Sequence, residues 1–522
     1  MSSPANNSKI ISRKELEQHA EEGKGWVVIN EDVYDLSKFY SMHPGGEEVL
    51  RHVYGQDATE EFYGLHKHEV LEKYAKFKVG RIEGASNPPI RMETWTDISA
   101  VPFAEAPFFR GEASPVWKPE HVAFRKEVRR WVNDNLKEDA NRCEATGEPP
   151  SAEVFKKLAD YGMLAMRIGP GEHLRHVKNG LPLGVRVEDF DYFHEQICHE
   201  EVVRLAAPGF VDGIGSGMVI GLPPLLNFGS DWMKDQVAGE VLRGEKRICL
   251  AITEPSAGSD VANVRTTAKL TPDGKFYIVN GVKKWITNGS ASDWFTTLVR
   301  TGGPGAGGLS FLLIPRTEGV ETKTIQTSYS KSAGTAYVQF DNVKVPVENL
   351  IGGENAGFFL SMSNFVHERW MIICYIVSAC RGILSEVFKW TNQRKAFGKN
   401  LLSQPVVRQR LAKMAVEVEA VTAAHEMLTF QMCQMHPLEQ GEKLAAKVSL
   451  LKFYATRVAQ QVSDDAVNIF GGRGITQSGM GKMTEQFNRT YKFAAILGGS
   501  EDVLADAGIR MSIKDFPTNA KL

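Results

Sequence analysis

The sequence is poor in cysteine and has no excess of either charge. Six cysteines occur in 522 residues, at positions 143, 198, 249, 374, 380 and 433, without the close spacing of a metal site or a disulfide framework. They predict free thiols in a reducing compartment. Lys and Arg number 61 against 63 Asp and Glu, a formal net charge of -2. This balance does not favour nucleic acid or an anionic membrane as a partner.

No apolar run is predicted to reach membrane-spanning length. The polar N-terminus, MSSPANNSKIISRKELEQ, lacks the apolar core of a signal peptide, and no stretch is predicted to insert into a membrane. The last three residues, Ala520, Lys521 and Leu522, resemble a C-terminal peroxisomal address with Ala in place of the usual Ser. They predict a peroxisomal location, and otherwise a cytoplasmic one.

Length and composition predict a globular protein of several domains. Hydrophobic residues make up 43% and charged residues 24% of the chain, and 522 residues exceed what one core supports. Changes in pattern divide the chain into five parts. These are a small α+β part (1–82), a linker (83–117), a helical part (118–247), a strand-rich part (248–352) and a part with long helices (353–522).

The first part contains histidines suited to bind a flat metal-containing ligand. A short hairpin (26–35) leads to His43, Pro44, Gly45 and Gly46, a turn with little side-chain cover over one imidazole. His66 and His68 follow two short helical stretches. Two neutral imidazoles facing each other would take both axial positions of a haem iron, which then exchanges single electrons and has no position for oxygen.

This part resembles the cytochrome b5 haem domain over about residues 10–82, through HPGGEEVL, GQDATEEF and the VG before Arg81. The resemblance implies haem b as cofactor and His43 as one axial ligand. The spacing common in the family would place the second ligand at Lys67, which cannot serve. His66 matches the members fused to flavin lactate dehydrogenases, so we prefer His66 to His68 as the second ligand.

The linker is rich in proline and shows no sustained periodicity, which predicts an extended segment. It nevertheless carries five large aromatic residues, Trp95, Phe103, Phe108, Phe109 and Trp117. A segment that stays in solvent seldom has so many, so we expect the linker to pack along another part of the protein.

Two runs in the strand-rich part form a predicted cradle for a planar heterocycle. The run 249–260 reads CLAITEPSAGSD, in which Pro255 cannot donate a backbone hydrogen bond and Gly258 permits close approach. The run 284–290 reads KWITNGS and offers Trp285 as a flat apolar face. The hydroxyl groups of Thr253, Ser259 and Thr287 add donors and acceptors.

These runs resemble the flavin-binding signatures of the acyl-CoA dehydrogenases in both order and spacing. The resemblance implies FAD as cofactor, an acyl-CoA substrate, and a fold of α-helical N-terminal domain, β-sheet middle domain and C-terminal four-helix bundle. The bundle implies a homodimer or homotetramer. The residues implied to line the flavin are Leu250, Ile252, Thr253, Ser259, Trp285 and Thr287.

Periodicity agrees with this order of helices, strands and helices. Helices are predicted over 121–136, 152–164, 190–206, 358–395, 406–433, 442–470 and 483–493, and strands over 276–279, 294–299, 309–314 and 337–340. Turns are predicted at Asp273-Gly274 and Asn280-Gly281. The glycine-rich run 210–229 predicts a helix that either lines the acyl pocket or packs in the core, and the sequence does not separate these alternatives.

The predicted chemistry needs a carboxylate to take the α proton of the thioester. In the most familiar family members this carboxylate precedes a Gly-Thr/Ser pair, and here that position is Gly498. A branch resembling the long-chain and isovaleryl enzymes carries its base before an arginine, which here is Glu368 in NFVHERW. We therefore predict Glu368 as the base, with Glu501 as its rival, and the Gly498 N-H as a donor to the thioester carbonyl.

The resemblance also implies flavin contacts from the C-terminal part, some of them to the cofactor of a neighbouring subunit. These residues are Arg394, Phe397, Gln404, Asn468, Gly472, Ser500 and Asp502. Asn468 replaces a longer glutamine and Asp502 departs from the usual residue.

The predicted function is FAD-dependent α,β-dehydrogenation of an acyl-CoA to the trans-2-enoyl-CoA, with electrons passed to the fused bis-histidine haem. Two alternatives remain, a peroxide-producing acyl-CoA oxidase and a flavohaem electron-transfer or sensor protein without dehydrogenase activity. The sequence does not identify the acyl chain or the terminal electron acceptor.

Overall fold

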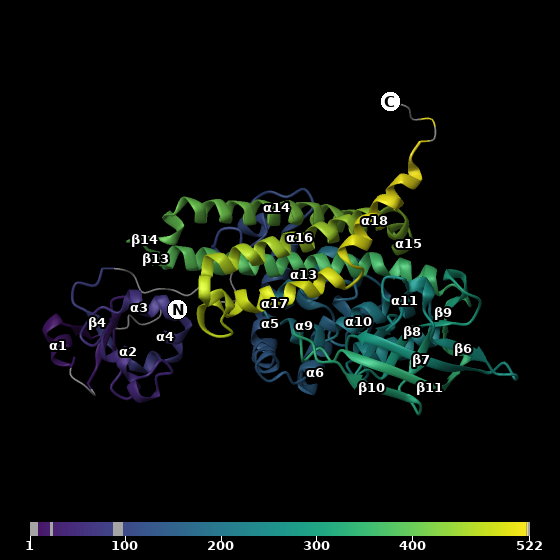
Figure 1. The fold of residues 1–522 in the computed structure, drawn as a ribbon, viewed down its shortest axis with the longest axis horizontal. Helices are drawn as coiled ribbons and strands as arrows, with labels where there is room; N and C mark the ends of the chain where they lie inside the picture. The colour runs from purple at the N-terminus through teal and green to yellow at the C-terminus, as the bar shows by residue number, and fades with distance from the viewer. Residues whose placement is uncertain (1–8, 21–23, 87–97, 518, 520–522) are drawn as a thin grey trace. The chain divides into compact units, whose positions relative to one another are not determined.

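The computed structural model describes residues 9–20, 24–86, 98–517 and 519. The predicted address at 520–522, and residues 87–97 of the linker with Trp95, lie outside the described residues. The chain forms two compact units. Unit 1 comprises residues 1–94, 386–411 and 467–485, and unit 2 comprises residues 95–385, 412–466 and 486–522. Figure 1 shows the elements of both, which are described separately here.

The N-terminal part of unit 1 is a small α+β structure. Its sheet has the order β1-β4-β3-β2. Asn30 and Glu31 adopt positive φ angles of 51° and 65° and form the tight turn of the predicted β2–β3 hairpin. The elements are β1 (Ile10–Ile11), α1 (Arg13–Gln18), β2 (Trp26–Ile29), β3 (Asp32–Asp35), α2 (Glu47–Arg51), α3 (Thr59–Leu65), α4 (Glu69–Lys73) and β4 (Lys78–Ile82).

Unit 2 begins with the described end of the linker and a set of helices. Trp117 is buried and stacks against Phe108, with ring centroids 6.1 Å apart, and lies 4.5 Å from the ring centroid of Phe193. This part of the linker therefore packs as expected. The helices are α5 (Pro119–Thr146), α6 (Ala152–Tyr161), α7 (Met163–Met166), α8 (Tyr192–Val203), α9 (Pro208–Gly213), α10 (Ser216–Gly221), α11 (Pro223–Phe228) and α12 (Ala238–Leu242).

An eight-stranded sheet follows, in the order β10-β11-β7-β6-β8-β9-β12, with β5 paired to β8. The pairing of β5 with β8 is parallel. Apolar side chains of β5, β7, β8, β9 and β11 form its core. The strands are β5 (Ile248–Ala251), β6 (Thr267–Leu270), β7 (Phe276–Ile286), β8 (Trp294–Arg300), β9 (Leu309–Pro315), β10 (Val320–Thr324), β11 (Ala336–Pro346) and β12 (Leu350–Ile351).

Long helices complete the chain. Within unit 2, Trp370 Nε1 donates to Thr429 Oγ1 at 2.9 Å and joins α13 to α14, and Ser463 Oγ lies 2.9 Å from Asn488 Oδ1 and joins α16 to α17. These helices run side by side in Figure 1. The remaining elements are α13 (Gly357–Gln393), β13 (Lys395–Ala396), β14 (Lys399–Asn400), α14 (Pro405–Cys433), α15 (Pro437–Lys443), α16 (Ala445–Phe470), α17 (Lys482–Ile496) and α18 (Glu501–Ser512).

Three sequence predictions differ from the structure. The run 210–229 forms three short helices, because Gly215 takes a positive φ of 120° and Pro223 begins a new helix. Asn280-Gly281 is not a turn but lies inside β7, where Thr266 Cα would be 2.6 Å from a Cβ at position 281. Helix α13 is long and apolar enough to cross a membrane, contrary to our prediction, although 67% of its most apolar window is buried.

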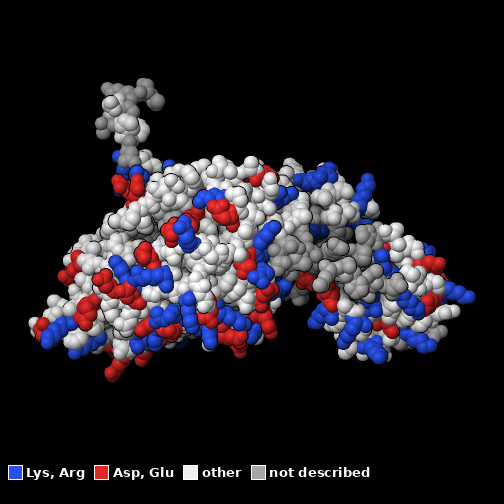
Figure 2. Space-filling model, turned by 180° about the vertical axis from the view of Figure 1, so that it is seen from behind, with Lys and Arg blue, Asp and Glu red and all other residues white. Residues whose placement is uncertain are grey.

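Charged groups are distributed over the surface and also buried. Figure 2 shows Lys and Arg intermingled with Asp and Glu on the face that it draws. A separate ionic cluster lies inside unit 2, where Arg129 is fully buried and donates to Glu105 Oε1 at 2.7 Å and to Glu201 Oε1 at 2.8 Å. Arg381 Nη1 donates to the Glu105 carbonyl oxygen at 3.0 Å. The linker is thereby fixed to α5, α8 and α13.

Substitution Glu105→Gln is expected to lower the free energy of unfolding by about 3–5 kcal/mol, because it leaves buried arginine charge without its carboxylate. Equilibrium urea unfolding followed by far-UV circular dichroism measures this loss. Glu127→Gln is the matched control on α5, since Glu127 pairs with the largely exposed Arg130. We expect it to leave the unfolding midpoint nearly unchanged, and equal shifts for the two variants would contradict the prediction.

Candidate active site

The two predicted flavin runs meet at the ends of β5 and β7. The Lys284 N-H donates to the Thr253 carbonyl oxygen at 2.8 Å and ties one run to the other. Leu250, Ile252 and Thr287 are buried, whereas Ser259 is exposed. The structure therefore brings the two runs into contact at Thr253 and Lys284.

A buried ion pair that the sequence analysis missed supports the first run. Lys283 has no exposed surface, and its Nζ lies 2.9 Å from Glu254 Oε1 and 2.9 Å from the Ile252 carbonyl oxygen. Glu254 also accepts hydrogen bonds from the backbone of Arg265 and Thr266. Burial lowers the pKa of Lys283 to about 8. The signal was a lysine in step with the inward-facing Tyr277 and Val279 of β7.

Trp285 is strained and open on one side. Its φ of 65° lies in the left-handed region, which a bulky residue rarely adopts, and 53% of its surface is exposed. Such strain at an exposed ring is typical of a binding site. A Cβ added at Gly258 would meet no atom within 4 Å, so the turn across from it is open too. Together with the Thr253 and Thr287 hydroxyls, these features fit a flat heterocycle such as FAD.

Substitution Lys283→Met is expected to weaken FAD binding by about 10–100-fold, because Glu254 loses its buried partner and the Thr253 turn loses a tether. Titration of the apoprotein with FAD, followed by quenching of flavin fluorescence, measures the dissociation constant. Lys269→Met on β6 removes an exposed lysine from the same sheet and serves as the control. Equal affinities for the two variants would show that the pair does not position the turn.

Glu368 lies inside unit 2 on α13. Only 4% of its surface is exposed, and Oε2 has no hydrogen-bond partner among the described residues. Burial raises its pKa to about 7, against the opposing charges of Arg369 and Lys452. A carboxyl with this pKa exchanges a proton readily near neutral pH. It therefore has the properties of a general base.

Gly498 lies beside Glu368. Its φ is 66°, and a Cβ at this position would lie 2.8 Å from Ile372 Cδ1 and 3.5 Å from Glu368 Oε1. Glycine is thus the residue that both the backbone and the space allow. Arg369 Nε donates to the Gly498 carbonyl oxygen at 2.9 Å, and Lys452 Nζ donates to that of Gly499 at 2.8 Å. The sequence analysis used Arg369 only to locate the predicted base, and it missed Lys452 and both of these contacts.

A second buried carboxylate lies behind Glu368. Glu195 Oε1 lies 2.7 Å from His367 Nε2 and 3.2 Å from His199 Nε2. Burial by itself lowers the pKa of His367, but the Glu195 charge and hydrogen bond outweigh it and raise that pKa above its ordinary value. The resulting positive charge beside Glu368 favours its ionised form. His367 belongs to the NFVHERW motif, whereas no sequence signal pointed to Glu195.

The other predicted flavin contacts are divided between the units. In unit 2, Ser500 occupies the N-cap position of α18 without a side-chain capping hydrogen bond, and Asp502 is exposed in the first turn of that helix. In unit 1, Phe397 has a φ of 54° and is 96% exposed in the β13–β14 hairpin. Arg394, Gln404, Asn468 and Gly472 also belong to unit 1. The rival base Glu501 pairs with Arg457 at 3.4 Å, unlike Glu368.

Unit 1 brings the rings of His43 and His66 next to each other, with centroids 6.0 Å apart and planes tilted by 54°. A metal–imidazole nitrogen bond is about 2 Å, and a ring centroid lies roughly 1 Å behind its nitrogen. Two imidazoles bound to one iron therefore have centroids about 6 Å apart. Gly45 is necessary beside His43, since a Cβ there would be 2.8 Å from His43 Cε1.

Hydrogen bonds hold both imidazole rings in the tautomer that can bind a metal through Nε2. His43 Nδ1 lies 3.1 Å from the Gly46 carbonyl oxygen, and His66 Nδ1 lies 3.2 Å from that of Phe62. A carbonyl oxygen accepts only, so each Nδ1 carries a proton and each Nε2 has a lone pair for a metal. Burial lowers the pKa of His66, which favours the neutral ring. These residues fit a haem iron.

His68 has a different environment. Its ring stacks on Tyr63 with an interplanar angle of 6°, and its Nδ1 is hydrogen-bonded to the Tyr63 hydroxyl. A hydroxyl can donate or accept a hydrogen bond, so it does not determine which ring nitrogen of His68 carries the proton. His68 also makes no ring contact with His43 among the described residues, whereas His66 does.

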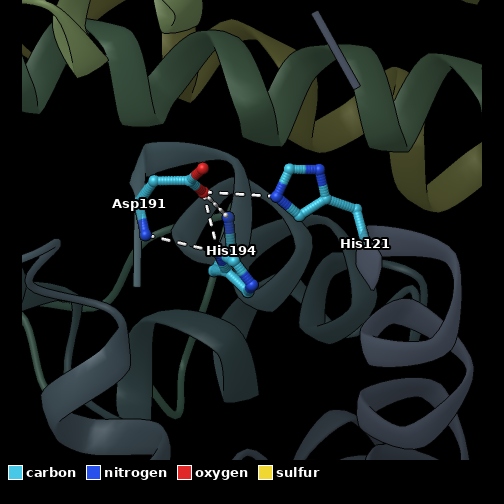
Figure 3. Close-up of side chains that lie close together, drawn as sticks. All are labelled: His121, Asp191 and His194. Carbon is cyan, nitrogen blue, oxygen red and sulfur yellow. Dashed lines mark hydrogen bonds and ion pairs between the residues drawn. The ribbon is translucent and has the colours of Figure 1, made fainter. Parts of the chain in front are cut away.

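A further cluster of His121, Asp191 and His194 has ligand atoms within 4.8 Å of one another. Figure 3 shows one Asp191 carboxylate oxygen in contact with both rings, 3.4 Å from His121 Nε2 and 2.7 Å from His194 Nδ1. Asp191 caps α8 by accepting from the backbone of His194 at 3.1 Å, and His121 Nδ1 accepts from the Lys118 N-H at 3.1 Å. The second bond leaves the proton on His121 Nε2, which points to a donor rather than a metal ligand. The cluster thus caps α5 and α8.

Four family models match the chain in order. They are the cytochrome b5-like heme/steroid binding domain (residues 12–83) and the N-terminal (118–245), middle (249–343) and C-terminal (355–512) domains of acyl-CoA dehydrogenase. The predicted fold class is confirmed.

Individual relatives support the same family. Acyl-CoA dehydrogenase apdG of Emericella nidulans is 41% identical over 430 residues, which cover 81% of this chain and 98% of the relative. Acyl-CoA dehydrogenase AFT10-1 of Alternaria alternata is 35% identical over 425 residues, covering 80% and 97%. The structure of acyl-CoA dehydrogenase from Geobacillus kaustophilus aligns with a TM-score of 0.66 at 25% identity, covering 77% of this chain and all of that one.

Three observations lead to one assignment. The middle-domain runs fit a flat heterocycle, the buried carboxyl of Glu368 has a pKa of about 7, and relatives cover four-fifths of the chain. This chain belongs to the acyl-CoA dehydrogenase family, FAD-dependent oxidoreductases, and carries a cytochrome b5-like domain before its dehydrogenase domains.

Proposed function

We propose that the protein dehydrogenates an acyl-CoA thioester between its α and β carbons with Glu368 as the base, and that the electrons leave singly through the haem of the N-terminal domain. The observation that carries the first part is the buried Glu368 carboxyl, with its unpartnered oxygen, against Gly498. This arrangement supports placement in the long-chain and isovaleryl-like branch of the family.

The chain's own residues act on the α proton and the thioester carbonyl. Glu368 in its ionised form takes the α proton, and Lys452 and Arg369 hold the Gly498-Gly499 carbonyls so that the Gly498 N-H can donate to the thioester oxygen. Bound FAD supplies the acceptor for the β hydride. The product is a trans-2-enoyl-CoA.

The FAD site is proposed to comprise the residues predicted from the sequence, with Trp285 on one face of the ring. The exposed Phe397 supports a homodimer or homotetramer in which the β13–β14 hairpin contacts a neighbouring subunit, because a phenylalanine is rarely left 96% exposed. Light scattering on the purified protein tests this assembly.

His43 and His66 are proposed to hold haem b. Bis-imidazole iron exchanges single electrons and has no position for oxygen. A covalent tether raises the local concentration of the acceptor, which favours transfer to this domain over a diffusing partner.

Anaerobic rapid mixing with a panel of acyl-CoA thioesters tests the proposal. We expect flavin bleaching followed by the absorbance bands of reduced haem. Bleaching without haem reduction would overturn the electron route, and peroxide on admission of air would then indicate an oxidase. No bleaching with any thioester would overturn the dehydrogenation itself.

A further inference from the structure

A cavity lies near the proposed base, although Glu368 itself does not line it. Its wall includes Met371 and Ile372, about one helical turn beyond Glu368, Leu497 before Gly498, and Thr287 of the flavin run. Its free volume is about 40 Å³, room for about three water-sized groups. The wall of this cavity is therefore the surface that the acyl group would meet.

The wall is unexpectedly polar for a site that takes an alkyl chain. Arg167 and Asp212 lie in it with 1% and 5% of their surfaces exposed, and Tyr329 with 8%. Arg167 Nε, Asp212 Oδ2 and the Tyr329 hydroxyl have no hydrogen-bond partner anywhere in the described ranges. Buried polar groups are nearly always hydrogen-bonded, so three such atoms on one cavity indicate a missing partner.

These groups also do not satisfy one another. In the part of the chain that the structure describes, no ion pair within 4.0 Å involves Arg167 or Asp212, and Arg167 Nη1 makes only a long hydrogen bond of 3.4 Å to the Ile214 carbonyl oxygen. Asp212 is fixed through its backbone, whose carbonyl oxygen accepts from Asn288 Nδ2 at 2.9 Å. Asn288 belongs to the KWITNGS run, so the flavin run holds Asp212 in the wall.

We propose that the acyl group of the substrate carries a hydroxyl substituent, which binds at Arg167, Asp212 and Tyr329. This inference rests on the proposed function and names the substrate class of that site. A hydroxyl accepts from the guanidinium and donates to the carboxylate, and the phenol can do either. Burial raises the pKa of Asp212 to about 7, so above that pH a substrate carboxylate would face its charge and a carbonyl would have no proton to donate to it.

The test compares pairs of acyl-CoA thioesters that differ only in one hydroxyl, placed at each carbon from the fourth to the end of hexanoyl- and octanoyl-CoA. The rate of flavin reduction divided by the dissociation constant is measured for each pair in anaerobic single turnovers. We expect a preference of about 100-fold for at least one hydroxylated thioester, because an alkyl chain leaves the buried polar groups unpaired.

The double variant Arg167→Met/Asp212→Leu removes both charges with little change of volume. We expect its preference to fall below about tenfold and its melting temperature not to fall, because unpaired polar groups have been replaced by apolar ones. Met371→Leu, an apolar change in the same cavity, should keep the preference.

Binding without turnover separates this inference from the proposed function. In the Glu368→Gln protein, the dissociation constants of each pair are measured by the change in flavin absorbance on titration. We expect the Glu368→Gln protein to bind the hydroxylated thioester with the same preference, and we expect that preference to be lost when Arg167→Met/Asp212→Leu is added. Equal affinities for both members of every pair, or a preference that survives the double variant, would overturn the inference. A retained preference with no bleaching in the unaltered protein would overturn only the proposed function.

Discussion

Substitution Glu368→Gln is expected to slow flavin reduction by acyl-CoA by about 10⁴-fold, because the amide cannot take the α proton. The side-chain volume is nearly unchanged, so FAD content and substrate affinity should remain close to those of the unaltered protein. Anaerobic stopped-flow absorbance measures the rate of flavin bleaching with a thioester from the panel.

Glu501→Gln is the matched variant, since Glu501 is the other carboxyl near the Gly498 turn and pairs with Arg457. We expect bleaching to persist in it. Loss of bleaching in Glu501→Gln with its retention in Glu368→Gln would move the base to position 501 and refute the assignment made here.

The pH dependence follows from the raised pKa of Glu368. The ionised carboxyl is the active form, so the rate of bleaching at low thioester concentration should rise as pH increases through about 7. Stability changes in the opposite direction. The folded protein holds this proton up to a pKa of about 7 against an ordinary 4.5, so the favourable contribution present below pH 4.5 is lost as pH rises through 7.

The size of that loss is on the order of 3 kcal/mol, from 1.36 kcal/mol for each pKa unit. Glu368→Gln removes the group and should abolish this part of the dependence, so the variant should be more stable than the unaltered protein at pH 8. Urea unfolding at pH 5 and pH 8 measures both proteins. The same pH dependence in the two would show that another group titrates.

Substitution His66→Ala or His43→Ala is expected to reduce haem content to less than about a tenth, because each would remove one of the two proposed axial ligands of the haem iron. Pyridine haemochrome absorbance measures haem per chain, and the visible spectrum reports six-coordinate iron. Added imidazole should restore part of the six-coordinate spectrum in His66→Ala, since it can enter the space that the ring leaves.

His68→Ala is the control two residues away, with a ring that stacks on Tyr63. We expect haem content and spectrum to be retained. An unchanged spectrum in His66→Ala together with haem loss in His68→Ala would assign the second ligand to position 68.

Local sequence patterns were sufficient for much of the fold. The HPGG turn, the β2–β3 hairpin and the runs around Thr253 and Trp285 depend on backbone preferences of a few adjacent residues, and the structure has them where they were predicted. The long helices α13, α14 and α16 follow from periodic apolar residues. The run 210–229 failed because its glycines and prolines also fit several short helices, of which α10 packs closely on β5.

Ion pairs between residues far apart in the chain could not be predicted from the sequence. Glu105 and Arg129 are both ordinary charged residues in the sequence, and only their burial together shows that they form one cluster with Glu201. Lys283 stands at an inward position of β7, but its pairing with Glu254 is shown only by their distance of 2.9 Å in the structure. Charge pairing leaves no local periodicity from which it could be predicted.

The sequence by itself determined the order of the domains, the family and the residue types that the chemistry needs, because motifs and hydrophobic periodicity are properties of neighbouring residues. Only the tertiary structure decided that Glu368 lies against Gly498, that His66 rather than His68 faces His43, and that Arg167 and Asp212 border one cavity with unpaired atoms. Burial and distance arise when remote segments pack together, and they set the pKa and the hydrogen-bonding needs of each side chain.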